Sequence, residues 1–185
     1  MKLPAQRMNE VVQQVEQEGV VACPAEAVWG LTCDPLSEDA VLQLLAMKHR
    51  PISKGLIIVA ASSTMLGPLL KPLASAQRNE LELSWPGPNT WLVPNRGLYP
   101  DWITGESDEI AIRVTSAPAL ALLSYRLGRP VVSTSANPAG AQPARHSFQV
   151  VRYFGRGLVR APGVVDLEAS PSTIRRVGTG EVLRA

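Results

Sequence analysis

Small polar side chains crowd the end of a buried apolar run at residues 131–140, VVSTSANPAG. Ser133, Ser135 and Asn137 follow two valines, and the carboxyl end of a strand is where open α/β sheets bind ligands. The PAG turn that comes next can form a nest of backbone N–H groups for an anion. The alternative is a turn whose hydroxyls satisfy only its own backbone. The amount of polarity favours a ligand site.

Three cations lie close together in KHRPISKG at residues 48–55. Pro51 ends the preceding helical pattern, so we expect Lys48, Arg50 and Lys54 to converge at the mouth of a sheet. Convergent Lys and Arg side chains suit phosphate oxygens. A solvated basic helix end is the alternative.

Two more charged residues are candidates for a site. Arg113 ends the alternating stretch EIAIRV, where it either faces solvent or reaches a carboxylate with its two-pronged guanidinium. Glu26 is the lone acid in CPAEAVWGL, and it belongs either to the first turn of a helix or to a site. The sequence assigns no catalytic side chain.

Other classes of site find no support in the sequence. No GxGxxG follows a strand pattern and no GxxxxGK[ST] occurs, so neither a Rossmann site nor a P-loop is indicated. No His/Cys/Asp cluster suggests a metal cage, and we expect Cys23 and Cys33 to be reduced, buried thiols. The net charge of +2 is too small to establish a nucleic-acid partner.

Hydrophobic periodicity supplies the elements that must position these residues. Helices are predicted at 7–18, 37–50, 74–85, 117–128 and 146–155. Strands are predicted at 20–23, 55–61, 90–95, 109–114 and 130–135, with short strands near 158–161, 172–177 and 181–185. Helices and strands therefore alternate, which favours one α/β domain with a mixed sheet over residues 1–185.

Six motifs occur in a fixed order along the chain: CPAEAVWGL, KxRP–xxKGL, WPGPxT, AxRVT, STSAN and SPSTIR. In this order they resemble the YrdC/TsaC family, the bacterial threonylcarbamoyl-AMP synthases, over residues 20–184. The chain is similar to the short, single-domain members. The resemblance implies a twisted, mixed but mostly parallel open sheet, with helices around a large concave basic cavity.

The resemblance also implies a reaction. L-threonine, bicarbonate and ATP yield threonylcarbamoyl-AMP and pyrophosphate, and partner proteins then modify the tRNA adenosine beside the anticodon. It implies that the ATP site contains Lys48, Arg50, Lys54, Ser135, Asn137 and Arg184. It implies that the threonine site contains Arg113, Ser133 and Ser172.

The expected cofactor is Mg²⁺, held by the phosphates and water and not by a protein metal site. We expect a cytoplasmic protein with no membrane segment, and tRNA or double-stranded RNA is a further candidate ligand. Cys23 and Ala25 depart from the family's usual Tyr-Pro-Thr-Glu, which removes a ring and a hydroxyl. Two alternatives stay open: an RNA-binding maturation factor without synthase activity, and a carbamoyl-handling paralogue that uses another amino acid.

Overall fold

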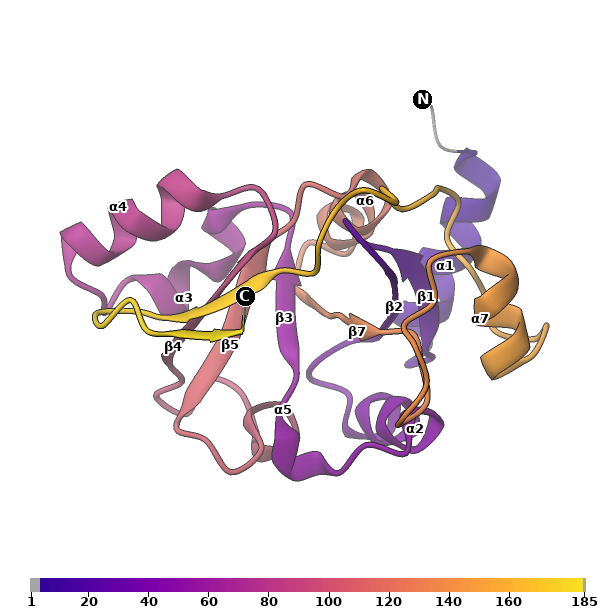
Figure 1. Cartoon of the computed structure of the whole chain (residues 1–185), viewed down its shortest axis with the longest axis horizontal. Helices are drawn as coiled ribbons and strands as arrows, with labels where there is room; N and C mark the ends of the chain where they lie inside the picture. Colours follow the sequence, from indigo (N-terminus) through magenta and orange to yellow (C-terminus); the bar gives the residue numbers. More distant parts are fainter. Residues whose placement is uncertain (1–3, 185) are drawn as a thin grey trace.

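Two β-sheets form the framework of the chain in a computed structural model that describes residues 4–184 (Figure 1). The larger sheet has the order β6 (Val131–Val132), β3 (Ile57–Ala60), β5 (Glu109–Val114), β4 (Asn89–Pro94), β8 (Thr173–Arg176), β9 (Val182–Arg184). The smaller sheet has the order β1 (Val21–Pro24), β2 (Trp29–Thr32), β7 (Thr134–Ser135).

Seven α-helices and two 3₁₀ turns surround the sheets in the described part of the chain. They are α1 (Ala5–Glu16), α2 (Glu38–Lys48), η1 (Ile52–Lys54), η2 (Ser63–Leu66), α3 (Gly67–Leu70), α4 (Ser75–Ser84), α5 (Asp101–Thr104), α6 (Pro118–Leu127) and α7 (Ser147–Phe154). The five helices predicted from periodicity are confirmed, with bounds that shift by one or two residues. None of the helices within residues 4–184 is both long and apolar enough to span a membrane.

Local sequence explains why α2 ends where the site begins. The Ser37 hydroxyl accepts a hydrogen bond from the Ala40 N–H, which caps the amino end, and two acids follow in the first turn. His49 adopts a left-handed conformation (φ 50°) and Pro51 follows, so the helix stops at Lys48. The chain then turns directly into η1 and β3.

The mixed α/β fold is confirmed, but the expectation of a mostly parallel sheet is wrong. Among the described residues of the larger sheet, only β3–β5 and β4–β8 pair in parallel, while β3–β6, β4–β5 and β8–β9 are antiparallel. The smaller sheet is antiparallel throughout. One reason lies between β4 and β5, where α5 is a single turn that sits at the strand ends beside η1 (Figure 1). Without a helix across the sheet face, neighbouring strands return antiparallel.

The predicted strand at 130–135 is split between the two sheets. Val131 and Val132 pair with β3, whereas Thr134 and Ser135 pair with β2. Ser133 is the residue between them, and its N–H donates to the Ile57 carbonyl at 2.9 Å. The sequence did not reveal β2 or the smaller sheet, so the predicted single strand is wrong.

Apolar side chains form two buried clusters. The larger one packs the main sheet against α2 and its neighbours, with Ile58, Ile112 and Trp91 among its members. The smaller one joins α1, α6 and β1, and includes Cys23. Cys23 and Cys33 are both buried and free, as predicted, and burial raises the pKa of each thiol. Helix α6 packs on both β1 and β3 and so ties the two sheets together.

Candidate functional site

A cavity of about 560 Å³ opens where the two sheets meet. Its lining comes from the β1–β2 turn, η1, β5, the 133–135 segment, and the C-terminal strands. It includes these residues predicted for the site: Arg50, Lys54, Arg113, Ser133, Ser135, Ser172 and Arg184. Lys48 and Asn137 are not among the lining residues. The 133–135 segment therefore faces a cavity and does not serve only its own turn.

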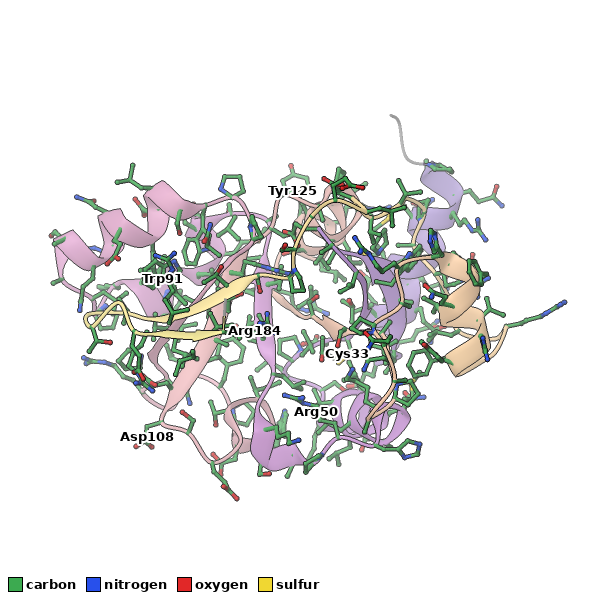
Figure 2. All side chains as sticks on the ribbon, in the orientation of Figure 1. Cys33, Arg50, Trp91, Asp108, Tyr125 and Arg184 are labelled. Atoms are coloured by element: carbon green, nitrogen blue, oxygen red, sulfur yellow. The ribbon has the colours of Figure 1, made fainter. Side chains whose placement is uncertain are left out.

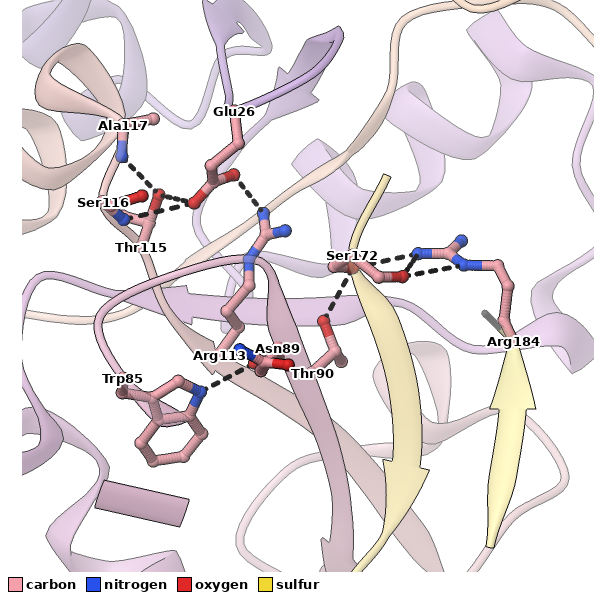
Figure 3. Close-up of polar contacts among 10 residues, drawn as sticks. All are labelled: Glu26, Trp85, Asn89, Thr90, Arg113, Thr115, Ser116, Ala117, Ser172 and Arg184. Atoms are coloured by element: carbon pink, nitrogen blue, oxygen red, sulfur yellow. Dashed lines mark hydrogen bonds and ion pairs between the residues drawn. The ribbon is translucent and has the colours of Figure 1, made fainter. Parts of the chain in front are cut away.

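A buried ion pair joins the two sheets in this cavity. The Arg113 Nη2 atom lies 3.3 Å from Glu26 Oε2, and the side chains are only 8% and 10% exposed (Figure 3). Glu26 Oε1 accepts hydrogen bonds from the Thr115 hydroxyl at 2.7 Å and from the Ser116 N–H at 3.2 Å. Three groups from the end of β5 thus surround one carboxylate from the β1–β2 turn.

This position corrects one interpretation of the sequence and refines another. Glu26 lies in a turn between two strands, so its placement in a helix first turn is wrong. Arg113 reaches a carboxylate, as one of the two interpretations of EIAIRV proposed, but that carboxylate belongs to the protein. Burial is the main influence on Arg113 and lowers its pKa, Glu26 raises it, and nearby Arg184 lowers it. The buried Nε of Arg113 has no hydrogen-bond partner among residues 4–184, so the guanidinium keeps donor capacity for a ligand.

Arg50 and Lys54 enter the cavity from η1. The Arg50 Nη2 atom donates to the carbonyls of Lys54 at 3.1 Å and Gly55 at 3.0 Å, and burial lowers the Arg50 pKa. Gly55 has φ 59°, and a Cβ there would lie 2.9 Å from the Thr104 carbonyl oxygen. Only glycine fits this turn, which aims the two cations at the cavity rather than along an exposed helix end (Arg50 in Figure 2).

Lys48 is buried and is not among the residues that line the cavity. The residue is 4% exposed, and its ammonium donates to the carbonyls of Ser135 and, at 3.0 Å, Asn137. Burial, and secondarily the charge of Arg50, lowers the Lys48 pKa to about 8. The Asn137 amide donates to the carbonyls of Pro138 at 3.1 Å and Ala141 at 2.9 Å. Both residues shape the loop that follows β7.

The C-terminal strands complete the lining. Arg184 of β9 donates from Nη2 to the Ser172 hydroxyl at 2.9 Å and to the Ser172 carbonyl at 2.7 Å (Figure 3). The Thr90 hydroxyl donates to the hydroxyl oxygen of Ser172 at 2.9 Å. Ser172 is buried, and with its oxygen already accepting, its own proton is available to donate towards the cavity.

The two departures from the family motif have different positions. Cys23 is 1% exposed and packs in the smaller core cluster, outside the cavity lining. Ala25 lines the cavity, so only the missing hydroxyl at this position changes the site. Pattern analysis missed one further group of lining residues, which surround the cavity beside β4, β5, β8 and β9: Leu92, Ser107, Glu109, Ile174 and Leu183. Leu92, Ser107 and Leu183 lie outside the six motifs, and Glu109 and Ile174 are an acidic and an apolar neighbour of the motif residues that were singled out. Pairing of β4 with β5 and β8 brings Leu92, Glu109 and Ile174 to one part of the sheet.

Comparison with known proteins places this architecture among relatives. A sequence model of the family Sua5_yciO_yrdC, described as "Telomere recombination", matches residues 13–185. The chain is 49% identical to a threonylcarbamoyl-AMP synthase of Cellvibrio japonicus, over 96% of this chain and 95% of that protein. It is 48% identical to the enzyme of the same name from Stutzerimonas stutzeri, over 96% of each chain.

Solved structures agree with the fold. The crystal structure of P. abyssi Sua5 complexed with L-threonine superposes with a TM-score of 0.85 at 27% identity, over 96% of this chain. This chain spans about half the length of that protein, 52%. E. coli YciO superposes with a TM-score of 0.84 at 20% identity, over 98% of this chain and 90% of that one, a likeness of fold alone.

Proposed function

The chain belongs to the Sua5/YciO/YrdC family, and from this premise we propose that it synthesises threonylcarbamoyl-AMP from L-threonine, bicarbonate and ATP, with release of pyrophosphate. The protein is an enzyme that forms an adenylate, like its bacterial relatives that are named threonylcarbamoyl-AMP synthase. These relatives match it over nearly their whole length, and a related Sua5 binds L-threonine.

One observation supports the proposal most directly: a single cavity contains a buried arginine with spare donors, two further cations from η1, and the hydroxyls of the 133–135 segment. An amino-acid carboxylate suits Arg113, because its guanidinium can donate two parallel hydrogen bonds. ATP phosphates suit Arg50 and Lys54.

The reaction needs such an arrangement of charge. The threonine amine condenses with bicarbonate, with loss of water, to an N-carboxylate. A carboxylate oxygen then attacks the α-phosphorus of ATP, and the bond to pyrophosphate breaks. The carboxylates and phosphates repel one another, so preorganised cations lower the barrier by offsetting the charge that develops. Holding the reactants together supplies a further ~7–11 kcal/mol in favourable cases.

We assign the lining residues to two substrates. Arg113, Ser133 and Ser172 bind threonine. Four residues bind ATP directly: Arg50, Lys54, Ser135 and Arg184. Lys48 and Asn137 contribute to the ATP site through the loop that contains Ser135, since neither lines the cavity.

Mg²⁺ enters this proposal only as a companion of ATP. Within residues 4–184, no three His, Cys, Asp or Glu side chains gather into a metal-binding group. Of the two acids in the lining, Glu26 is surrounded by its own partners and Glu109 pairs with Arg176 at 3.0 Å. We therefore propose that phosphate oxygens and water hold the ion.

The product implies partners. We propose that residues 1–185 act as one YrdC-like domain in the cytoplasm and pass threonylcarbamoyl-AMP to proteins that modify tRNA. Direct binding of tRNA or double-stranded RNA is an additional proposal, for which phosphate contacts need only Lys and Arg.

Pyrophosphate release by the purified protein tests the function. Release should require ATP, bicarbonate and L-threonine together, and it should fall sharply in Arg113→Lys, which keeps the charge but loses the bidentate geometry. Arg176→Lys, a change outside the cavity lining, is the matched control. Turnover driven by another amino acid would identify a paralogue. RNA affinity that falls steeply with salt, without any ATP turnover, would identify an RNA-binding factor.

A further inference from the structure

We infer that Lys48 is a positioning residue, which fixes the loop at 133–139 so that one buried ammonium supports both the threonine and the ATP side of the cavity. The inference rests on the proposed function for its kinetic consequences. Its structural content stands without that function.

Lys48 binds the loop through its side chain and through its backbone. Its ammonium donates to the Ser135 and Asn137 carbonyls, and its own carbonyl accepts from the Ala139 N–H at 2.8 Å. The residue is 4% exposed and is not among those that line the cavity. Within residues 4–184, no carboxylate lies within ion-pair distance of this ammonium. The carbonyls of the loop are therefore its binding partners.

Two converging carbonyls create the need for a cation. The Ser135 and Asn137 oxygens both point at the same nitrogen, and the residue after Asn137 is a proline, which has no N–H to offer. Without the ammonium, two negative dipole ends would face each other in a buried place, at a substantial cost. The loop would have to rearrange, and Ser133 and Ser135 would move with it.

Arg50 provides a contrast with Lys48, because it is a nearby cation that does line the cavity. It lies two residues after Lys48, beyond the left-handed turn at His49, and it lines the cavity. The turn thus sends one cation into the loop and the next into the cavity. If Arg50 binds phosphate and Lys48 supports the loop, removing one side chain should affect the protein differently from removing the other.

Lys48→Met tests the inference, with Lys54→Met as the matched control. Lys54 is also a lysine near the same turn, but it is exposed and lines the cavity. Without ligands, hydrogen–deuterium exchange of the 133–141 amides should become faster in Lys48→Met and stay unchanged in Lys54→Met. This exchange measurement does not depend on enzyme activity. If the wild type releases no pyrophosphate, the proposed function is refuted, but the exchange measurement still tests the role of Lys48.

Kinetics supply the second measurement. In Lys48→Met, kcat/KM should fall by roughly tenfold or more for threonine and for ATP alike, because both substrates touch the loop. In Lys54→Met, only the ATP value should fall. Lys48→Arg keeps the charge and donors and should restore part of both values. If Lys48→Met does not fold, Lys48→Gln gives the same comparison.

Two results would overturn the inference. One is unchanged exchange of the 133–141 amides in a folded Lys48 variant. The other is a loss confined to ATP, with the threonine value intact, which would make Lys48 a phosphate ligand.

Discussion

Replacing Glu26 by glutamine should destabilise the protein strongly, although the side chain keeps its size and shape. The new amide would still offer an oxygen to the Thr115 hydroxyl and the Ser116 N–H, which now lie 2.7 and 3.2 Å from the carboxylate. What disappears is the charge opposite Arg113. The guanidinium stays charged, because arginine does not deprotonate in proteins, so a buried cation loses its counter-charge.

The structure sets the magnitude. Unit charges 3.3 Å apart attract by ~5 kcal/mol at an effective dielectric constant of ~20. Desolvation offsets part of this attraction, yet removing one partner of a buried pair typically costs ~3–5 kcal/mol, because the other charge remains buried. Glu26→Gln should therefore lower the free energy of unfolding by about 3 kcal/mol, and Glu26→Ala by more, since it also removes two accepted hydrogen bonds.

Urea unfolding at neutral pH measures this change, and Glu109→Gln provides the control. Glu109 pairs with Arg176 at 3.0 Å, but both side chains are far more exposed than the buried pair, and exposed pairs contribute little. A double-mutant cycle with Arg113→Met should give a large coupling energy, and the cycle for Glu109 and Arg176 a small one. Equal losses of unfolding free energy for Glu26→Gln and Glu109→Gln would refute the reasoning, because burial of the ion pair would then make no difference to its contribution.

Three further predictions concern the cavity and the loop. Arg50→Ala should weaken ATP binding by ~1.5–3 kcal/mol in calorimetry, and it should also lower the melting temperature because its bonds to the Lys54 and Gly55 carbonyls are lost; unchanged affinity would return Arg50 to a structural role. Ser133→Ala combined with Ser135→Ala should impair pyrophosphate release with respect to both substrates, and wild-type kinetics in this variant would disprove the assignment of this segment. The pKa of Lys48 is about 8 in the folded protein and 10.5 ordinarily, so the unfolded chain binds more protons between these values. The free energy of unfolding should therefore rise with pH across that window relative to Lys48→Met, as followed by urea unfolding at several pH values; parallel curves would contradict the lowered pKa.

Local pattern predicted most of the elements but little of their pairing. The helix of residues 5–16 is marked by Met8, Val11, Val12 and Val15, whose spacing places them on one buried face. The strand Trp29–Thr32 escaped prediction because its sequence, WGLT, includes a glycine and forms neither an apolar run nor an alternating pattern. Which strands pair depends on contacts between distant residues, and no single stretch of sequence encodes them.

In the candidate site, too, local pattern predicted some residues, whereas the roles of others depend on contacts between distant residues. Motifs marked Arg50, Arg113 and Ser135 because their polarity is unusual where it occurs. The importance of Glu26 depends on a partner 89 residues away, Thr115, which local sequence does not show. The inward direction of Lys48 likewise depends on where the Asn137 carbonyl lies, 89 residues along the chain.

The place of β8 and β9 in the cavity wall has a consequence for synthesis on the ribosome. The cavity is walled by segments near residues 26, 50, 113 and 133 and is finished by Arg184 on β9. A nascent chain that has emerged only as far as α7 possesses β1 to β7 but lacks β8 and β9. It cannot yet offer Ser172 or Arg184 to a substrate, so substrates can stabilise the early intermediates only through the part of the site that is already present. Because its contacts are largely non-local, the fold should form late and slowly. The two apolar clusters should supply most of the stability of the early intermediates.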